Sequence, residues 1–322
     1  MRIHRRTLLA SFLGLFATSA TNADAYPARP IALYTAFGGG GEQVYRILAK
    51  RISEILGQPI VVISEPAAAG VIAATKVSQA APDGYTLLAG NSPTQVFKPL
   101  TLKSIRYNPL RDFTAISQVS EPVMVLAVSR DLAIHNVPAL FAYARNNPAK
   151  SFLGAFGSGG TADLSIQLLR NAGGAALASV TYKEDSQPMI DTVAGRLLGT
   201  VGTGSTMRNF AQSGGGVRIL AVLAEQRQPG WEDVPTVGEQ IPGFKPLHTF
   251  TGIFGPSKMP PAIVARLNEA IVKALDDPSV RTLVVSAGSV VRSSSPQALS
   301  ELVRTEIERV GPVLKQAGIQ PE

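Results

Sequence analysis

The sequence predicts an α/β fold of two lobes joined by two connecting strands. Two segments, Ile31–Leu56 and Phe152–Asn171, each contain a short apolar strand, a glycine-rich turn and a helix pattern. Strand and helix patterns alternate around both segments, which indicates parallel strands covered by helices on both faces. Apolar strands near Val123–Val128 and Phe250–Phe254 connect the two units. Two lobes with two crossings predict a hinged cleft that binds a ligand.

The first 25 residues predict a secretory signal peptide. Arg2, Arg5 and Arg6 precede an apolar stretch, Leu8–Ala17, that is too short to span a bilayer. The sequence Ala-Asp-Ala at residues 23–25 is typical of a signal-peptide cleavage site. We therefore expect residues 1–25 to be removed on export, by either the Sec or the twin-arginine route.

Composition excludes several classes of function for the remaining chain. Cleavage leaves 322 − 25 = 297 residues, and removal of three Arg and one Asp changes the net charge to 7 − (3 − 1) = +5. The basic residues are scattered and there is one Trp, which argues against nucleic acid as a partner. The chain has no Cys, and only His135 and His248 remain, which argues against a histidine-rich metal site. We expect a monomer without metal or cofactor.

The two lobes follow from the order of the predicted elements. Lobe 1 begins with strands and helices that alternate, at Ile31–Phe37, Glu42–Leu56, Ile60–Ile63, Ala67–Ala80 and Tyr85–Ala89. Lobe 2 continues the alternation, at Val137–Asn146, Phe152–Phe156, Ala162–Asn171, Ser179–Tyr182, Pro188–Ala194, Leu197–Val201 and Arg218–Leu223. Helices then return to lobe 1, at Pro260–Leu275, Val280–Ala287 and Pro296–Ala317. We expect irregular chain at residues 91–112 and 226–245, and lobe boundaries of 26–124 with 253–322 for lobe 1 and 125–252 for lobe 2.

Each glycine turn predicts a site for an anion at the start of a helix. The first N–H groups of a helix have no partner within the helix, and its dipole places positive charge there. Gly38–Gly41 lack side chains, so their amides can approach a ligand closely. The second turn, around Gly157 and Gly159, has the same arrangement. The alternative for either segment is an ordinary flexible turn.

Several ordered motifs resemble one family of exported receptors. They are Tyr26-Pro-x-Arg-Pro30-Ile, Leu56-Gly-Gln-Pro-Ile-Val-Val62, Ala81-Pro-Asp-Gly-Tyr-Thr-Leu-Leu88, Val180-x-Tyr-Lys183, Arg218-x-Leu-Ala-Val222, Asp233-Val-Pro-Thr236, Gly252-x-x-x-Pro256 and Ala317-Gly-Ile319. Their order resembles that in the periplasmic solute receptors of tripartite tricarboxylate transporters, the Bug family. The resemblance implies a type II periplasmic binding protein fold in which two α/β lobes close over a small ligand.

The resemblance also implies a site, a location and partners. Main-chain amides of two facing glycine loops hold ligand carboxylates in the family, and membrane transporter subunits are the implied partners. On this chain the implied ligand-binding residues are Phe37, Gly38, Gly39, Gly40, Gly41, Glu42, Asn91, Ser158, Gly159, Gly160, Thr161, Asp163, Tyr182 and Thr203. The implied function is capture, in the periplasm, of a ligand that bears a carboxylate or an amide, for uptake or for sensing.

The sequence departs from the family pattern at this site. The family has N-R-P-G-A-G-G after its second strand, where this chain has S-E-P-A-A-A-G at residues 64–70. Glu42 and Asp163 are either acids of the site or helix N-terminal residues favoured by the dipole. If they belong to the site, they disfavour a second carboxylate, so we expect a ligand with at most one. We also expect loop amides, more than charged side chains, to provide the affinity.

Two other functions fit parts of the sequence. An exported enzyme of the hydrolase type is one alternative, although neither Ser158 nor Ser205 lies in a G-x-S-x-G motif. A dinucleotide site is the other, because residues 157–162 fit G-x-G-x-x-A and Glu184 follows the next strand. Turnover of a ligand would indicate an enzyme, whereas stoichiometric binding of an unaltered ligand would indicate a receptor.

Overall fold

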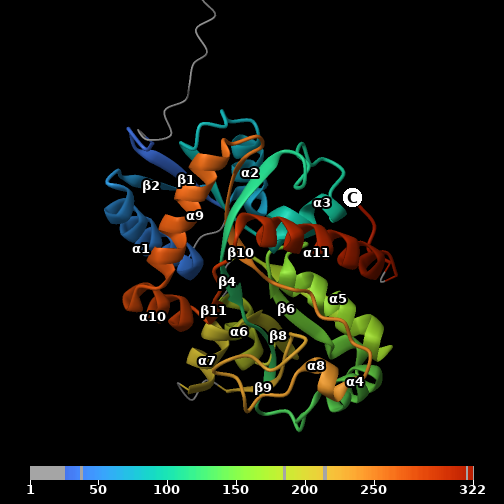
Figure 1. Cartoon of the computed structure of the whole chain (residues 1–322). Helices are drawn as coiled ribbons and strands as arrows, with labels where there is room; N and C mark the ends of the chain where they lie inside the picture. Colours follow the sequence, from blue (N-terminus) through green and yellow to red (C-terminus); the bar gives the residue numbers. More distant parts are fainter. Residues whose placement is uncertain (1–25, 37–38, 184–185, 213–215, 317, 322) are drawn as a thin grey trace, which may run out of the picture.

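The computed structural model describes residues 26–36, 39–183, 186–212, 216–316 and 318–321. Its strands form two separate sheets, one in each lobe (Figure 1). The lobe 1 sheet has the order β11-β4-β10-β3-β1-β2, and its strands are β1 (Ile31–Thr35), β2 (Ile60–Ser64), β3 (Thr86–Asn91), β4 (Phe113–Pro122), β10 (Thr251–Pro256) and β11 (Ser289–Val291). The three strands β2, β1 and β3 are parallel, as the alternation of strands and helices predicts. The strand β10 is antiparallel to both of its neighbours, β3 and β4.

The lobe 2 sheet has the order β7-β6-β8-β5-β9. Its strands are β5 (Met124–Ser129), β6 (Phe152–Phe156), β7 (Ala178–Tyr182), β8 (Gly199–Thr203) and β9 (Val217–Val222). The strands β7, β6 and β8 are parallel, and β5 is antiparallel to β8 and β9. The parallel part of each sheet therefore has all its carboxyl ends on one edge, which is where ligands bind in open α/β sheets.

Helices cover both faces of both sheets, so each lobe has two apolar layers. On lobe 1, α1 (Gly39–Leu56), α9 (Pro261–Leu275) and α10 (Pro278–Ser286) pack on one face, and α2 (Val71–Ser78) and α11 (Pro296–Gln316) on the other. On lobe 2, α4 (Val137–Asn146) and α5 (Thr161–Gly173) cover one face, while α6 (Gln187–Val193) and α7 (Gly204–Gln212) cover the other. The short helical segments are η2 (Ala67–Gly70), η3 (Pro93–Phe97), α3 (Lys98–Thr101), η4 (Pro148–Lys150) and α8 (Val237–Gln240).

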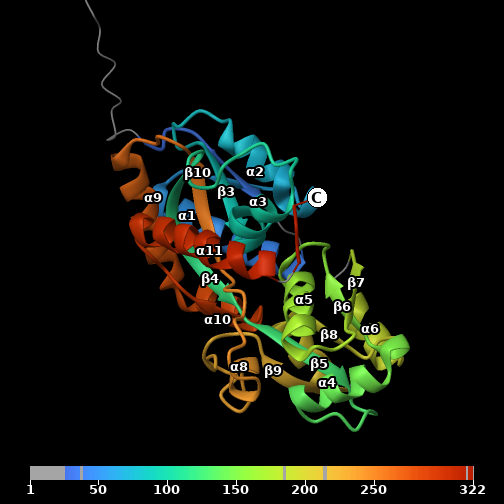
Figure 2. The same cartoon turned by 90° about the vertical axis from the view of Figure 1, so that its right-hand side faces the viewer.

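Two segments cross between the lobes. The strand β4 continues through Val123 into β5, and Figure 2 shows this path from one lobe to the other. The return crossing leads into β10, where Thr249 Oγ1 donates to the Pro122 carbonyl at 2.6 Å. Ser92 Oγ accepts from the Phe250 amide at 2.7 Å, which fixes the return crossing to lobe 1. A hinge of this kind needs few backbone changes to open or close.

Three segments differ from the sequence-based expectation. The chain at 91–112 contains η3 and α3, because Pro93 and Pro99 stand at the first turns of helical segments, where proline is tolerated. The expected helix Ala67–Ala80 is divided into η2, which contains left-handed Ala68 and Ala69, and α2, which begins after left-handed Gly70. No helix is among the elements expected between Leu197–Val201 and Arg218–Leu223, but the structure has α7 there, and its buried Met207 packs in an apolar cluster with Trp231.

Candidate functional site

The first glycine loop forms the start of α1. Gly39–Gly41 supply the first turn of this helix directly after β1, whereas the candidate residues 37 and 38 lie outside the described residues. Glu42 lies in the same turn and accepts from Arg46 Nε at 2.8 Å and from Ser64 Oγ. The bond from Ser64, helped by Arg46, lowers the pKa of Glu42 and keeps it ionised. Glu42 therefore braces the loop against the end of β2.

The segment η2 lies next to the first loop and has a constrained backbone. Ala68 and Ala69 adopt positive φ angles of 51° and 53°, which L-residues other than Gly, Asn and Asp rarely do. Gly70 has φ 83°, and a Cβ there would lie 2.4 Å from the Cβ of Ala36. Ala69 stands where the family pattern has a glycine, whereas Ala68 aligns with an alanine of that pattern, so the departure at residue 69 has a conformational cost.

The second glycine loop is held by bonds within lobe 2. The Gly157 amide donates to the Tyr182 carbonyl at 3.0 Å, and the Gly160 amide donates to Gly157 at 3.1 Å. The Gly159 amide donates to Asp163 Oδ2 at 2.7 Å, and Asp163 is buried. Asp163 thus caps the loop from the first turn of α5, and its Oδ2 atom is directed at this amide.

The other candidate residues from the sequence lie at the carboxyl ends of strands. Asn91 ends β3, and its Oδ1 atom accepts from the Thr94 amide at 3.1 Å. The Tyr182 hydroxyl donates to Asp191 Oδ2 at 2.7 Å, and burial together with this bond raises the pKa of Tyr182 to about 12. Thr203 ends β8 and donates to Thr206 Oγ1 at 3.1 Å.

The structure brings the second glycine loop against lobe 1 through a residue that sequence reasoning missed. Lys98 of α3 donates from Nζ to the Ser158 carbonyl at 2.7 Å, and Lys98 is only 7% exposed. Beside this bond, Leu164 and Leu168 of α5 belong to one apolar cluster with Val96 and Phe97 of lobe 1. The lobes are therefore in contact, as in a closed cleft. That the two glycine loops face each other stays a prediction, because residues 37 and 38 are outside the described chain.

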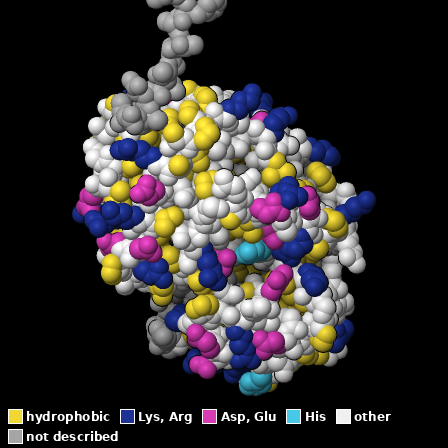
Figure 3. Space-filling view, in the orientation of Figure 1, with side chains coloured by type: hydrophobic (Ala, Val, Ile, Leu, Met, Phe, Trp, Pro, Cys, Tyr) yellow, Lys and Arg dark blue, Asp and Glu magenta, His cyan; other side chains and the backbone are white. Residues whose placement is uncertain are grey.

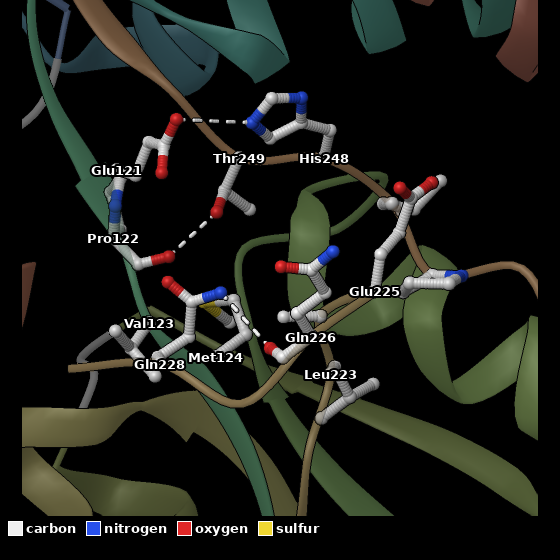
Figure 4. Close-up of a pocket in the computed structure, with 13 residues that line it drawn as sticks. Glu121, Pro122, Val123, Met124, Leu223, Glu225, Gln226, Gln228, His248 and Thr249 are labelled. Carbon is white, nitrogen blue, oxygen red and sulfur yellow. Dashed lines mark hydrogen bonds and ion pairs between the residues drawn. The ribbon is translucent and has the colours of Figure 1, made fainter. Parts of the chain in front are cut away.

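A cavity of about 200 Å³ lies at the hinge, away from both glycine loops. Its walls include Glu121, Met124, Gln226, His248 and Thr249, and Figure 4 shows their side chains around it. No candidate residue from the sequence lines this cavity.

Over the face in Figure 3, acidic and basic side chains are interspersed, without a large area of one sign.

A charged cluster beside the cavity connects the two crossings. His248, in the return crossing, lies with Nε2 3.4 Å from Glu121 and Nδ1 3.8 Å from Glu306. Arg292 pairs with Glu121 at 3.0 Å and Arg309 with Glu306 at 2.7 Å. Bonds to the two carboxylates raise the pKa of His248 to about 9.

Within the described chain no helix is long and apolar enough to cross a membrane, and no group of His, Asp and Glu could hold a metal ion.

Two α/β lobes in contact with each other have the architecture of a two-lobe solute-binding protein. Residues 44–319 match the tripartite tricarboxylate transporter family receptor. This match covers most of the chain, so the protein belongs to that family, and the resemblance in the motifs is confirmed. Members are ligand-capturing receptors, so the alternatives of an exported hydrolase and of a dinucleotide enzyme are not retained.

Two proteins that are similar in sequence over nearly their whole length support the assignment to this family. A UPF0065 protein from Pseudomonas sp. strain P51 is 32% identical over 314 residues, covering 95% of this chain and 93% of that protein. Protein BugT from Bordetella pertussis is 29% identical and covers 97% of this chain and 98% of that protein.

Solved structures agree in fold over nearly the whole chain. R. palustris Rpa4515 with adipate has a TM-score of 0.83 at 29% identity, covering 92% of this chain and all of that one. MatC from Rhodopseudomonas palustris with bound malate has a TM-score of 0.79 at 28% identity, covering 90% of this chain and all of that one.

Proposed function

We propose that this receptor captures a small organic carboxylate between its lobes and delivers it to the membrane subunits of a tripartite transporter. The observation that carries the proposal is the likeness to two receptors that hold the dicarboxylates adipate and malate. The position of the candidate residues at the carboxyl ends of the parallel strands supports the same site. In this proposal the amides of residues 38–42 and 157–161 hold the carboxylates.

The charges of the described cleft bear on how many carboxylates the ligand has. Glu42 is paired with Arg46, and Asp163 accepts from the Gly159 amide, so neither acid is directed only at a ligand. Lys98 adds a positive charge that the sequence argument did not count. The case for at most one carboxylate is therefore weaker than the sequence implies, and we include dicarboxylates in the proposed class.

The proposal has consequences for the whole chain. Residues 1–25 direct export by the Sec or twin-arginine route, and the mature receptor acts in the periplasm as a monomer. Residues 26–124 and 253–322 move as lobe 1, and residues 125–252 move as lobe 2. The receptor needs neither metal nor cofactor for capture.

Thermal melting against a panel of ligands tests the proposal. The panel contains malate, adipate, citrate, glutamate, nicotinate and nicotinamide, with sodium chloride matched in ionic strength as the control. A ligand at one hundred times its Kd stabilises the folded state by about 2.7 kcal/mol, which raises Tm by several degrees. A shift with at least one acid and none with nicotinamide supports the proposal, whereas no shift with any acid would contradict it.

A further inference from the structure

The contact between Lys98 and the second glycine loop is one of the contacts between the two lobes. Lys98 belongs to α3 of lobe 1, and the carbonyl that accepts its hydrogen bond belongs to Ser158 of lobe 2. The donor and acceptor are 60 residues apart in sequence. Because they belong to different lobes, a rotation about the hinge that moved the lobes apart would break this bond.

The second glycine loop leaves room for the Lys98 ammonium group because residue 159 has no side chain. Gly159 has φ 60°, and a Cβ at this position would lie 2.9 Å from Lys98 Nζ. The side chain of Thr101 borders the same space, with Oγ1 4.0 Å from that Cβ position. Glycine at 159 therefore adopts the positive φ without strain and leaves room for the ammonium group of Lys98.

The loop is held from two sides when the cleft is closed. On the lobe 2 side, Asp163 Oδ2 accepts from the Gly159 amide at 2.7 Å. On the lobe 1 side, Lys98 Nζ holds the carbonyl of the preceding residue at 2.7 Å. Hydrogen bonds that involve a charged donor are stronger than neutral ones, and Lys98 is buried from competing water.

We propose that Lys98 is a positioning residue for ligand capture, which holds the second glycine loop against lobe 1 and so slows release of the ligand. The inference rests on the proposed function for its ligand, but the closure itself is independent of which ligand binds. Lys98 acts through the Ser158 carbonyl and the loop amides. It therefore affects the dissociation rate and leaves the association rate nearly unchanged.

The test compares three variants with the wild type. Lys98→Met removes the charge and the donor while it keeps a long side chain, and Lys98→Arg restores a charged donor. Lys103→Met is the matched control, because Lys103 follows the same helix and is exposed. Stopped-flow measurements with malate and adipate give the two rate constants, and small-angle scattering gives the radius of gyration without ligand.

The expected result is specific to Lys98. Loss of a hydrogen bond to a charged group should raise the dissociation rate about ten- to hundred-fold in Lys98→Met, with partial recovery in Lys98→Arg. In this proposal the ligand-free receptor exchanges between open and closed lobes, so ligand-free Lys98→Met should be shifted towards the open form and have a larger radius than Lys103→Met and the wild type. Unchanged dissociation and an unchanged radius in Lys98→Met would overturn the inference. A wild type that binds neither acid would count against the proposed function, while the ligand-free radii would still decide the role of Lys98.

Discussion

His248 should stabilise the hinge in its protonated form, and this contribution should depend on pH. Its ring lies between Glu121 and Glu306, and these carboxylates raise its pKa from 6.5 to about 9. Because the pKa of His248 is higher in the folded state than in the unfolded state, protonation of the imidazole stabilises the folded state. This contribution is fully present below pH 6.5 and is lost as pH rises through about 9. A shift of this size corresponds to about 3 kcal/mol. Since the side chain is 39% exposed, screening by solvent reduces it to about 1–2 kcal/mol.

The variant His248→Gln tests this contribution, since glutamine keeps a hydrogen-bond donor and removes the charge. Urea unfolding should show a loss of about 1–2 kcal/mol at pH 6 and almost none at pH 10. His135→Gln is the control, because His135 is exposed and has no ion pair among the described residues. An equal loss at both pH values would mean that the imidazole acts by packing alone, and no loss at pH 6 would refute the ion pair.

Two further predictions concern the backbone around the first and second loops. Ala68→Gly and Ala69→Gly should each raise the free energy of unfolding by about 0.5–1 kcal/mol, because glycine removes the strain of a positive φ at some cost in chain entropy. Gly70→Ala, measured in the same urea series, should lower the free energy of unfolding, since the new Cβ would lie 2.4 Å from that of Ala36. A lower free energy of unfolding in both alanine-to-glycine variants would show that η2 is not strained. Gly39→Val and Gly159→Val should each abolish ligand binding by calorimetry while circular dichroism remains that of the wild type. Normal binding in both would place the site elsewhere.

The repeated strand and helix patterns predicted most of the fold correctly. Apolar runs such as Ile31–Thr35 and Phe152–Phe156 are parallel strands, and local sequence is sufficient to identify them. The antiparallel pairing of β10 with β3 and β4 depends on contacts between distant segments, so periodicity does not reveal it. Proline is common in irregular chain, so the sequence alone favours that state for residues 91–112, although Pro93 and Pro99 lie in the first turns of helical segments.

Part of the site was harder to predict, because two of its bonds join residues that are distant in the sequence. Glycine turns before helices are visible in the sequence, and both are found at strand ends. The acids at 42 and 163 could be identified, and their partners Arg46 and Gly159 are each only four residues away. The bond from Ser64 to Glu42 could not be predicted, because Ser64 lies 22 residues from Glu42. The sequence did not indicate a role for Lys98, because its hydrogen-bond partner is the carbonyl of Ser158 in the other lobe. A lysine next to a proline in a segment expected to be irregular resembles any exposed residue.

The most direct test of a receptor that closes over its ligand is the radius of gyration with and without that ligand. Two crossings between the lobes allow the lobes to rotate with little change elsewhere. Small-angle scattering on the full mature receptor, at saturation with the acid that raises Tm most, should give a smaller radius than the ligand-free protein. An unchanged radius at saturating ligand would contradict capture in a hinged cleft.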